Sequence, residues 1–220
     1  MFFTESYESE RLQRLSAKES IGEMEELVAV NLSKGGAVDL AKSNPGLTLV
    51  DAGLGWDPVT VNGKPVDCDV SAFLLNSNGR VGSDSDLVFY NNEWSADRSV
   101  KAATDDRTGG ASDGGDDEVM KIDLSKVASS VERIVVVATI DEAGPRGHNF
   151  GQVSNAYIRV VNQVNNSEIL RYDLSGDFSK NDAVIFGEFR RISGGWEFKA
   201  VGEGRTGGLL TLCKEYGVNV

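Results

Sequence analysis

From Leu27 onward, the chain is a series of short apolar runs separated by Gly, Asn, Asp and Pro. The runs are rich in Val, Ile, Phe, Tyr and Thr, a composition typical of β-strands. They lie at residues 27–32, 47–56, 69–75, 86–90, 133–140, 156–161, 168–174, 183–189 and 195–201. Because no long helical segment separates them, the pattern predicts an all-β fold, a two-layer β-sandwich of short antiparallel strands.

Turn and helix signals complete this pattern. The sequences NSNG at 76–79 and SGG at 193–195 are typical of turns between antiparallel neighbours. Only the tail predicts a short C-terminal helix, with an apolar face of Leu209, Leu210, Cys213 and Tyr216 and with Gly217 placed to end it. Residues 1–26 are rich in Glu, Ser, Arg and Lys, and we interpret them as a disordered or weakly helical arm before a sandwich domain at 27–220.

Composition and charge narrow the range of partners. With 220 residues, of which 40% are hydrophobic, the chain can bury one full-sized core. The formal net charge of −12 disfavours nucleic acid as a partner, and it disfavours direct membrane binding unless calcium bridges the two surfaces. Two distant cysteines, Cys68 and Cys213, and the lack of a signal-like or membrane-spanning apolar run favour a cytoplasmic location with reduced thiols.

Acidic residues are concentrated around the predicted strands between residues 67 and 118. Because side chains alternate along a strand, Asp67 and Asp69 are expected on one side and Cys68 on the other. The same alternation would put Asp84 and Asp86 on one side, just before the apolar residues 87–90. Downstream lie Asn91, Asn92, Asp97, Asp105, Asp106, Asp113, Asp116, Asp117 and Glu118, the last of which leads into another strand.

Like charges so close together destabilise a fold unless water or a cation screens them. Ca²⁺ suits the acidic segment, because it takes about 6 to 8 oxygen ligands in forgiving geometry. Zinc, copper and iron are disfavoured, since the chain has one histidine and no paired cysteines. The spacing is not that of an EF-hand, so a solvated acidic loop remains the alternative.

Several motifs, in order and spacing, make the chain similar to the TerD family of bacterial tellurium-resistance and stress proteins. They include GLGWD at 53–57, DCDVSAFLLNSNGRV at 67–81, DSDLVFYNN at 84–92, GGDDEVMKIDL at 114–124 and FGQVSNAYIRVVN at 150–162. The resemblance covers about residues 28–220. It implies a cytoplasmic β-sandwich that binds Ca²⁺ at an acidic surface and works with other proteins of a stress-response assembly.

The resemblance also implies a set of metal ligands. Carried over by position, they are Asp67, Asp69, Asp84, Asp86, Asn91, Asn92, Asp105, Asp116, Asp117 and Glu118. The chain departs from the family pattern at Cys68, at Arg98 after Asp97, and in a longer loop near Ala111. The expected function is therefore that of a non-enzymatic calcium-binding scaffold or interaction module.

Other functions fit the residues less well. Paired carboxylates could serve a glycosidase-like hydrolase, which also needs a cleft lined by sugar-stacking aromatic side chains. Thiol chemistry on tellurite would need a reactive thiolate at Cys68 or Cys213, and acidic neighbours raise a thiol pKa. His148 is expected to be an exposed loop residue. A module attached to a membrane or to an acidic partner through a calcium bridge is a further alternative.

Overall fold

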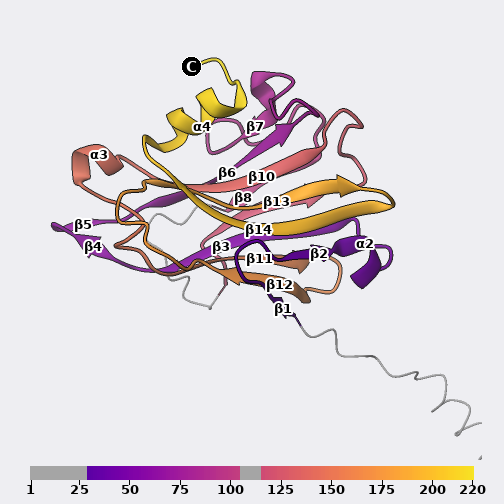
Figure 1. The fold of residues 1–220 in the computed structure, drawn as a ribbon, viewed down its shortest axis with the longest axis horizontal. Coiled ribbons are helices and arrows are strands. Elements are labelled where there is room, and N and C mark those ends of the chain that lie inside the picture. The colour runs from indigo at the N-terminus through magenta and orange to yellow at the C-terminus, as the bar shows by residue number, and fades with distance from the viewer. Residues whose placement is uncertain (1–28, 105–114) are drawn as a thin grey trace, which may run out of the picture.

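The computed structural model describes residues 29–104 and 115–220, and these form two six-stranded sheets packed face to face (Figure 1). Sheet A has the order β1 (Val30–Asn31), β12 (Glu168–Asp173), β11 (Ser154–Asn162), β3 (Leu49–Asp57), β9 (Glu118–Asp123) and β8 (Val100–Thr104). Sheet B has the order β2 (Ala37–Asp39), β14 (Gly195–Arg205), β13 (Ala183–Ile192), β10 (Arg133–Ile140), β6 (Cys68–Leu75) and β7 (Leu87–Val88). The predicted two-layer β-sandwich is confirmed.

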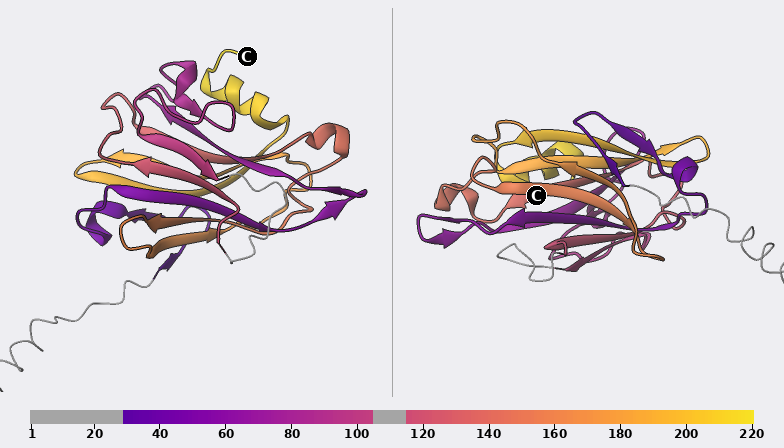
Figure 2. Two further views of the ribbon diagram at one scale, coloured as in Figure 1. Left: turned by 180° about the vertical axis from the view of Figure 1, so that it is seen from behind. Right: turned by 90° about the horizontal axis from the view of Figure 1, so that it is seen from below.

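Short elements decorate the two sheets. A hairpin of β4 (Thr60–Val61) and β5 (Lys64–Pro65) extends from one end of the sandwich (Figure 2). The helices are α2 (Leu40–Ser43), the 3₁₀ turn η1 (Asp84–Asp86), α3 (Ala143–Arg146) and α4 (Gly208–Tyr216). No helix among the described residues has the length and apolar character needed to cross a membrane.

Alternation along the strands builds the main core. In β6, Cys68, Val70, Ala72 and Leu74 point between the sheets, where they join the buried cluster that includes Val50, Ala52 and Leu54 of β3. The intervening residues Phe73 and Leu75 point to the outer face of sheet B, where they form a second apolar cluster. The prediction that Cys68 faces away from Asp67 and Asp69 is thereby supported by its place in the core.

Helix α4 covers this second cluster and adds a partial third layer over sheet B (Figure 1). Leu212, Cys213 and Tyr216 are its buried residues, and Gly217 ends the helix at a φ of 83°. The predicted position of the helix and its glycine stop are confirmed. The predicted apolar face is wrong in one respect, because Leu210 is 52% exposed and Leu212 is the leucine that packs against the sheet.

Most of the predicted strands are present, with three kinds of difference. The run at 86–90 contributes only the two residues of β7, and β2, β4, β5 and β8 had no predicted counterpart. β1 pairs with β12 in parallel, whereas the other pairings are antiparallel. The predicted arm at 1–26 lies outside the described residues.

Candidate metal centre

Two pairs of carboxylates, one from each sheet, lie within electrostatic range of the Cys68 thiol. Asp67 and Asp69 flank this cysteine at the start of β6 in sheet B, and Asp117 and Glu118 lie at the start of β9 in sheet A. β6 and β9 contact each other across the sandwich, and all four carboxylates act electrostatically on the Cys68 thiol. We call Asp67, Asp69, Asp117 and Glu118 the acidic cluster. It joins residues that are about fifty positions apart in the chain.

The sheet A half of the acidic cluster is buried. Asp117 is 2% exposed, and its Oδ2 accepts a hydrogen bond of 2.8 Å from the backbone N–H of Trp56. The backbone N–H of Asp117 in turn donates to the carbonyl of Leu54 at 2.9 Å. Glu118 is 6% exposed and pairs with Leu54 in the ladder between β3 and β9. The main chain of β3 therefore fixes the position of both residues.

The sheet B half lies at the end of β6, next to the end of β10. Asp69 is opposite Thr139 in the ladder, and the carbonyl of Asp67 accepts a hydrogen bond of 2.9 Å from the backbone N–H of Asp141. Both aspartates are half-buried. The acidic cluster thus has two half-buried carboxylates on sheet B and two buried ones on sheet A.

The environment of the two cysteines opposes thiol chemistry. Burial, followed by the charges of the acidic cluster, raises the pKa of the Cys68 thiol well above its ordinary value. Burial and the nearby Asp84 raise the pKa of Cys213. A thiol with a raised pKa stays protonated at neutral pH and is a poor nucleophile. This finding counts against a direct reaction of tellurite with either cysteine.

Asp116, although adjacent to Asp117, belongs to a different network. Its Oδ1 accepts hydrogen bonds from Arg159 Nε at 2.7 Å and from the Tyr157 hydroxyl at 3.1 Å, both on β11. Burial and then the Asp116 charge raise the pKa of Tyr157 to about 12. Gly53 makes room for this arrangement, since a Cβ at that position would clash with the Asp116 carboxylate. Asp116 is therefore engaged by an arginine and a tyrosine.

Asp84 and Asp86 do not follow strand alternation, because they lie in the 3₁₀ turn η1. Asp86 accepts hydrogen bonds from the backbone N–H groups of Gly82 at 3.1 Å and Ser83 at 3.0 Å. Asp84 accepts hydrogen bonds from the backbone N–H and the side-chain amide of Asn219, which lower its pKa. The expectation that these two carboxylates share one side of a strand is wrong, and both brace local structure.

Strand register separates this turn from the acidic cluster. Leu75, at the far end of β6 from Cys68, bridges to Val81 just before the turn. β7 then runs back along β6 in antiparallel fashion, with Val88 opposite Ala72. The structure therefore does not bring Asp84 and Asp86 together with Asp67 and Asp69.

The two asparagines follow β7 in a tight turn. Asn92 and Phe89 exchange backbone hydrogen bonds of 2.9 and 3.1 Å, and the Asn92 side chain donates to the Leu87 carbonyl at 2.6 Å. Asn91 lines an open cleft of about 540 Å³ that also contains Trp94 and Arg98. Asp105, the remaining predicted ligand, lies outside the described residues.

The donor chemistry of the acidic cluster suits a hard cation, because its four side chains offer only carboxylate oxygens. Within residues 29–104 and 115–220, no three His, Cys, Asp or Glu side chains already stand in the arrangement of a metal site.

His148 is buried. It is 4% exposed, so the expectation of an exposed loop histidine is wrong. Its backbone N–H donates to the carbonyl of Ala143, the first residue of α3.

Comparison with known proteins assigns the chain to a family. The family model described as TerD domain matches residues 28–216. The chain is 50% identical to tellurium resistance protein TerD of Serratia marcescens over 192 residues, which cover 87% of this chain and 99% of that protein. It is 44% identical to general stress protein 16U of Bacillus subtilis over 194 residues, which cover 88% of this chain and all of that one.

The fold has a counterpart among solved structures. A crystal structure of a homologue of telluride resistance protein (TerD) from Streptomyces coelicolor matches with a TM-score of 0.60 and 26% identity, over 76% of this chain and 95% of that chain. Sequence and fold therefore agree, and the chain belongs to the TerD domain family of tellurium-resistance and stress-response proteins.

Proposed function

We propose that this chain is a non-enzymatic, cytoplasmic Ca²⁺-binding protein that serves as a scaffold in a tellurium-resistance or stress response. The observation that carries the proposal is the acidic cluster, in which two carboxylates of sheet A and two of sheet B lie within electrostatic range of one buried thiol, that of Cys68. A divalent cation at this position would connect the two sheets at one end of the sandwich. Binding would therefore act on the stability of the whole domain.

The physical reason lies in the charge of the cluster. Carboxylates that share a small, partly buried volume repel one another, and a divalent cation offsets that repulsion. One oxygen of Asp117 accepts from the Trp56 N–H, and all four carboxylates of the acidic cluster are candidate ligands. Because no three-group site is ready-made in the described residues, side chains would have to rotate toward the ion. Asp84, Asp86, Asn91, Asn92, Asp105 and Asp116 stay predicted ligands outside this cluster.

The glycosidase-like alternative gains no support from the tryptophans. Trp56 and Trp196 are buried, and Trp196 stacks against Arg191. Trp94 is partly exposed, and the cationic groups of Arg98 and Lys101 lie 5.4 and 5.1 Å from the centre of its ring. A sugar ring would need an open aromatic surface beside the carboxylates. For this reason we prefer binding to catalysis.

Thermal unfolding of metal-stripped protein, with and without Ca²⁺, tests the proposal. A ligand at about one hundred times its Kd stabilises a domain by about 2.7 kcal/mol, which corresponds to a rise in melting temperature of roughly 5 to 10 °C at this size. The double variant Asp67→Asn, Asp69→Asn should lose this rise. Mg²⁺ should give a smaller rise, because it demands octahedral geometry and dehydrates reluctantly.

The matched control is Asp173→Asn with Asp177→Asn, which removes the same charge at two exposed positions. It should keep the full calcium response. If the parent protein showed no rise, or if both double variants responded equally, calcium binding at the acidic cluster would be refuted.

A further inference from the structure

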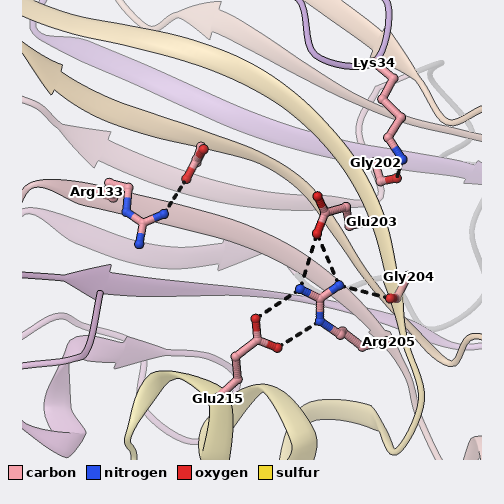
Figure 3. Close-up of polar contacts among 8 residues, drawn as sticks. Lys34, Arg133, Gly202, Glu203, Gly204, Arg205 and Glu215 are labelled. Carbon is pink, nitrogen blue, oxygen red and sulfur yellow. Dashed lines mark hydrogen bonds and ion pairs between the residues drawn. The ribbon is translucent and has the colours of Figure 1, made fainter. Parts of the chain in front are cut away.

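The outer face of sheet B carries a groove of about 550 Å³ beside α4. It begins at the loop before β2 and crosses β14, β13 and β10 to the turn after β6, while the end of α4 forms one wall. Its size falls within the range of small-molecule sites, about 300 to 1,000 Å³. Figure 3 shows polar contacts of several lining residues between β14 and α4.

The groove has an unusual charge for so acidic a chain. Five Lys and Arg residues line it against three Glu, an excess of two positive charges in a protein of net charge −12. The cations are Lys34, Arg133, Arg190, Lys199 and Arg205, and the carboxylates are Glu188, Glu203 and Glu215. A concave surface with such an excess concentrates anions.

One end of the groove is internally neutralised. Arg205 donates to both oxygens of Glu215, from Nε at 2.8 Å and from a terminal nitrogen at 3.0 Å, and it also contacts Glu203 at 3.3 Å (Figure 3). These carboxylates raise the pKa of Arg205 further above its ordinary value. These contacts join α4 to β14. They also compensate the charge of Arg205, which is therefore not available to a ligand.

The other end holds three cations around the buried carboxylate of Glu188, and one of them, Arg190, also lies 3.6 Å from a carboxylate oxygen of Glu197. Glu188 is 6% exposed, and its two oxygens accept from Arg133 at 3.2 Å and from Arg190 at 2.8 Å. Lys199 lies directly opposite Glu188 in the ladder between β13 and β14. Within the described part of the chain, its ammonium group has no carboxylate within 4.0 Å. Glu188 thus holds the two guanidinium groups beside each other, and both arginines line the groove.

Lys34 adds a further cation from the loop before β2. Its ammonium group donates to the backbone carbonyl of Gly202 at 2.8 Å, which leaves its charge without a carboxylate partner in the described residues (Figure 3). Apolar residues separate the two ends of the groove, namely Val135, Ile185, Val201 and Tyr216. The groove therefore offers fixed cations next to an apolar surface.

From this arrangement we propose that the groove binds a small organic phosphate monoester, with its phosphate at Arg133, Arg190 and Lys199 and its organic part over the apolar residues. A phosphate monoester carries about −1.5 to −2 charge at neutral pH, which matches the excess of two positive charges. Two guanidinium groups and an ammonium group can surround a tetrahedral anion, whereas one arginine already satisfies a planar carboxylate.

The site is separate from the acidic cluster, so its test does not depend on calcium. β10 begins at Arg133 in the groove and ends at Ile140, which pairs with Cys68. A strand of this length places the two sites about 23 Å apart, at roughly 3.3 Å per residue. Binding can therefore be measured on metal-stripped protein, where no calcium phosphate forms.

Calorimetric titration of the full chain with phenyl phosphate and with inorganic phosphate tests the proposal. Phenyl phosphate should bind saturably, and about tenfold more tightly than inorganic phosphate, because its ring removes apolar surface from water. Lys199→Gln should weaken binding about tenfold, the loss expected for one charge-assisted hydrogen bond. Lys199→Arg, which keeps the charge, should bind nearly as well as the parent.

Lys64→Gln is the matched control, because it removes one exposed cation on the β5 hairpin, away from the groove. It should bind phenyl phosphate as the parent does. Each variant's unfolding midpoint in urea should equal that of the parent, which shows that the fold is retained. The proposal is overturned by a lack of saturation in the millimolar range, by equal affinity for the two phosphates, or by equal losses in Lys199→Gln and Lys64→Gln.

Discussion

The carboxylate of Asp117 accepts a 2.8 Å hydrogen bond from the main-chain N–H of Trp56, and this bond is buried in the sheet A half of the acidic cluster. Asp117→Ala should leave that N–H group without an acceptor and destabilise the metal-free protein by about 1 to 3 kcal/mol. Asp117→Asn keeps an acceptor oxygen and should cost less. Urea unfolding of the two variants measures the difference, and Asp177→Ala, at an exposed position, is the control; equal costs for Asp117→Ala and Asp117→Asn would contradict this account.

Gly53 should resist substitution for a reason unrelated to its backbone. A Cβ there would clash with the Asp116 carboxylate, which must then move away from Arg159. We expect Gly53→Ala to destabilise the protein by about 1 to 3 kcal/mol. Gly144→Ala is the control, since a Cβ at that position meets no neighbouring atom within 4 Å. Similar unfolding free energies for the two variants would show that Asp116 moves aside without cost.

The two leucines of α4 provide a matched pair. Leu212 is fully buried against sheet B, whereas Leu210 is 52% exposed on the same helix. Leu212→Ala should destabilise by about 2 to 5 kcal/mol, through lost burial and the cavity that remains. Leu210→Ala should change stability by less than about 0.5 kcal/mol. The denaturant midpoints of the two variants measure these losses in stability. Comparable losses would mean that α4 is rotated about its axis and packs a different face against sheet B.

Asp97 should make stability depend on pH in the acid range. Burial opposes ionisation, but hydrogen bonds from the Ala128 N–H, Ser99 and Ser95 outweigh it and lower the Asp97 pKa below 3.8. A carboxyl whose folded-state pKa is depressed contributes stability that is present above its unfolded pKa and is lost as pH falls through the folded value. Asp97→Asn should therefore be less stable than the parent at pH 7, with the gap closing below about pH 4. Urea unfolding at pH 7 and pH 3 measures the gap, and a constant gap would exclude this origin.

Both thiols should be inert in the folded state. Cys68 and Cys213 are buried, and both have raised pKa values. We expect a disulfide reagent to react with the two thiols only as fast as the protein unfolds. The reaction should become rapid in a few molar urea, which exposes both thiols. In a host where this chain confers tellurite resistance, Cys68→Ser with Cys213→Ser should retain it. Loss of resistance in a stably folded double variant would restore the thiol hypothesis.

Local patterns predicted much of the fold. Strand alternation correctly put Cys68 in the core, and Gly217 correctly marked the end of α4. Alternation failed at Asp84 and Asp86 because the segment forms a 3₁₀ turn with a capping box. That signal was present in the sequence, since Ser83 precedes Asp86 by three residues.

The pairing of carboxylates across the sandwich could not be read from local sequence. Asp67 and Asp69 share the surroundings of Cys68 with Asp117 and Glu118 only because β6 and β9, in different sheets, contact each other. Likewise, nothing near Asp116 in the chain indicates that Arg159 would engage it while Asp117 turns inward. Such relationships depend on strand order, which is a property of the whole fold.

The course of β10 gives the molecule an electric polarity. One end of this strand adjoins four carboxylates, and its other end adjoins a groove with excess cations. This separation of charge contributes a dipole along β10, and the field of an approaching charged partner would exert a torque on it. Approaching partners would meet the protein in a preferred orientation, and added salt would erase that preference, because screening at 0.15 M ionic strength acts over about 8 Å.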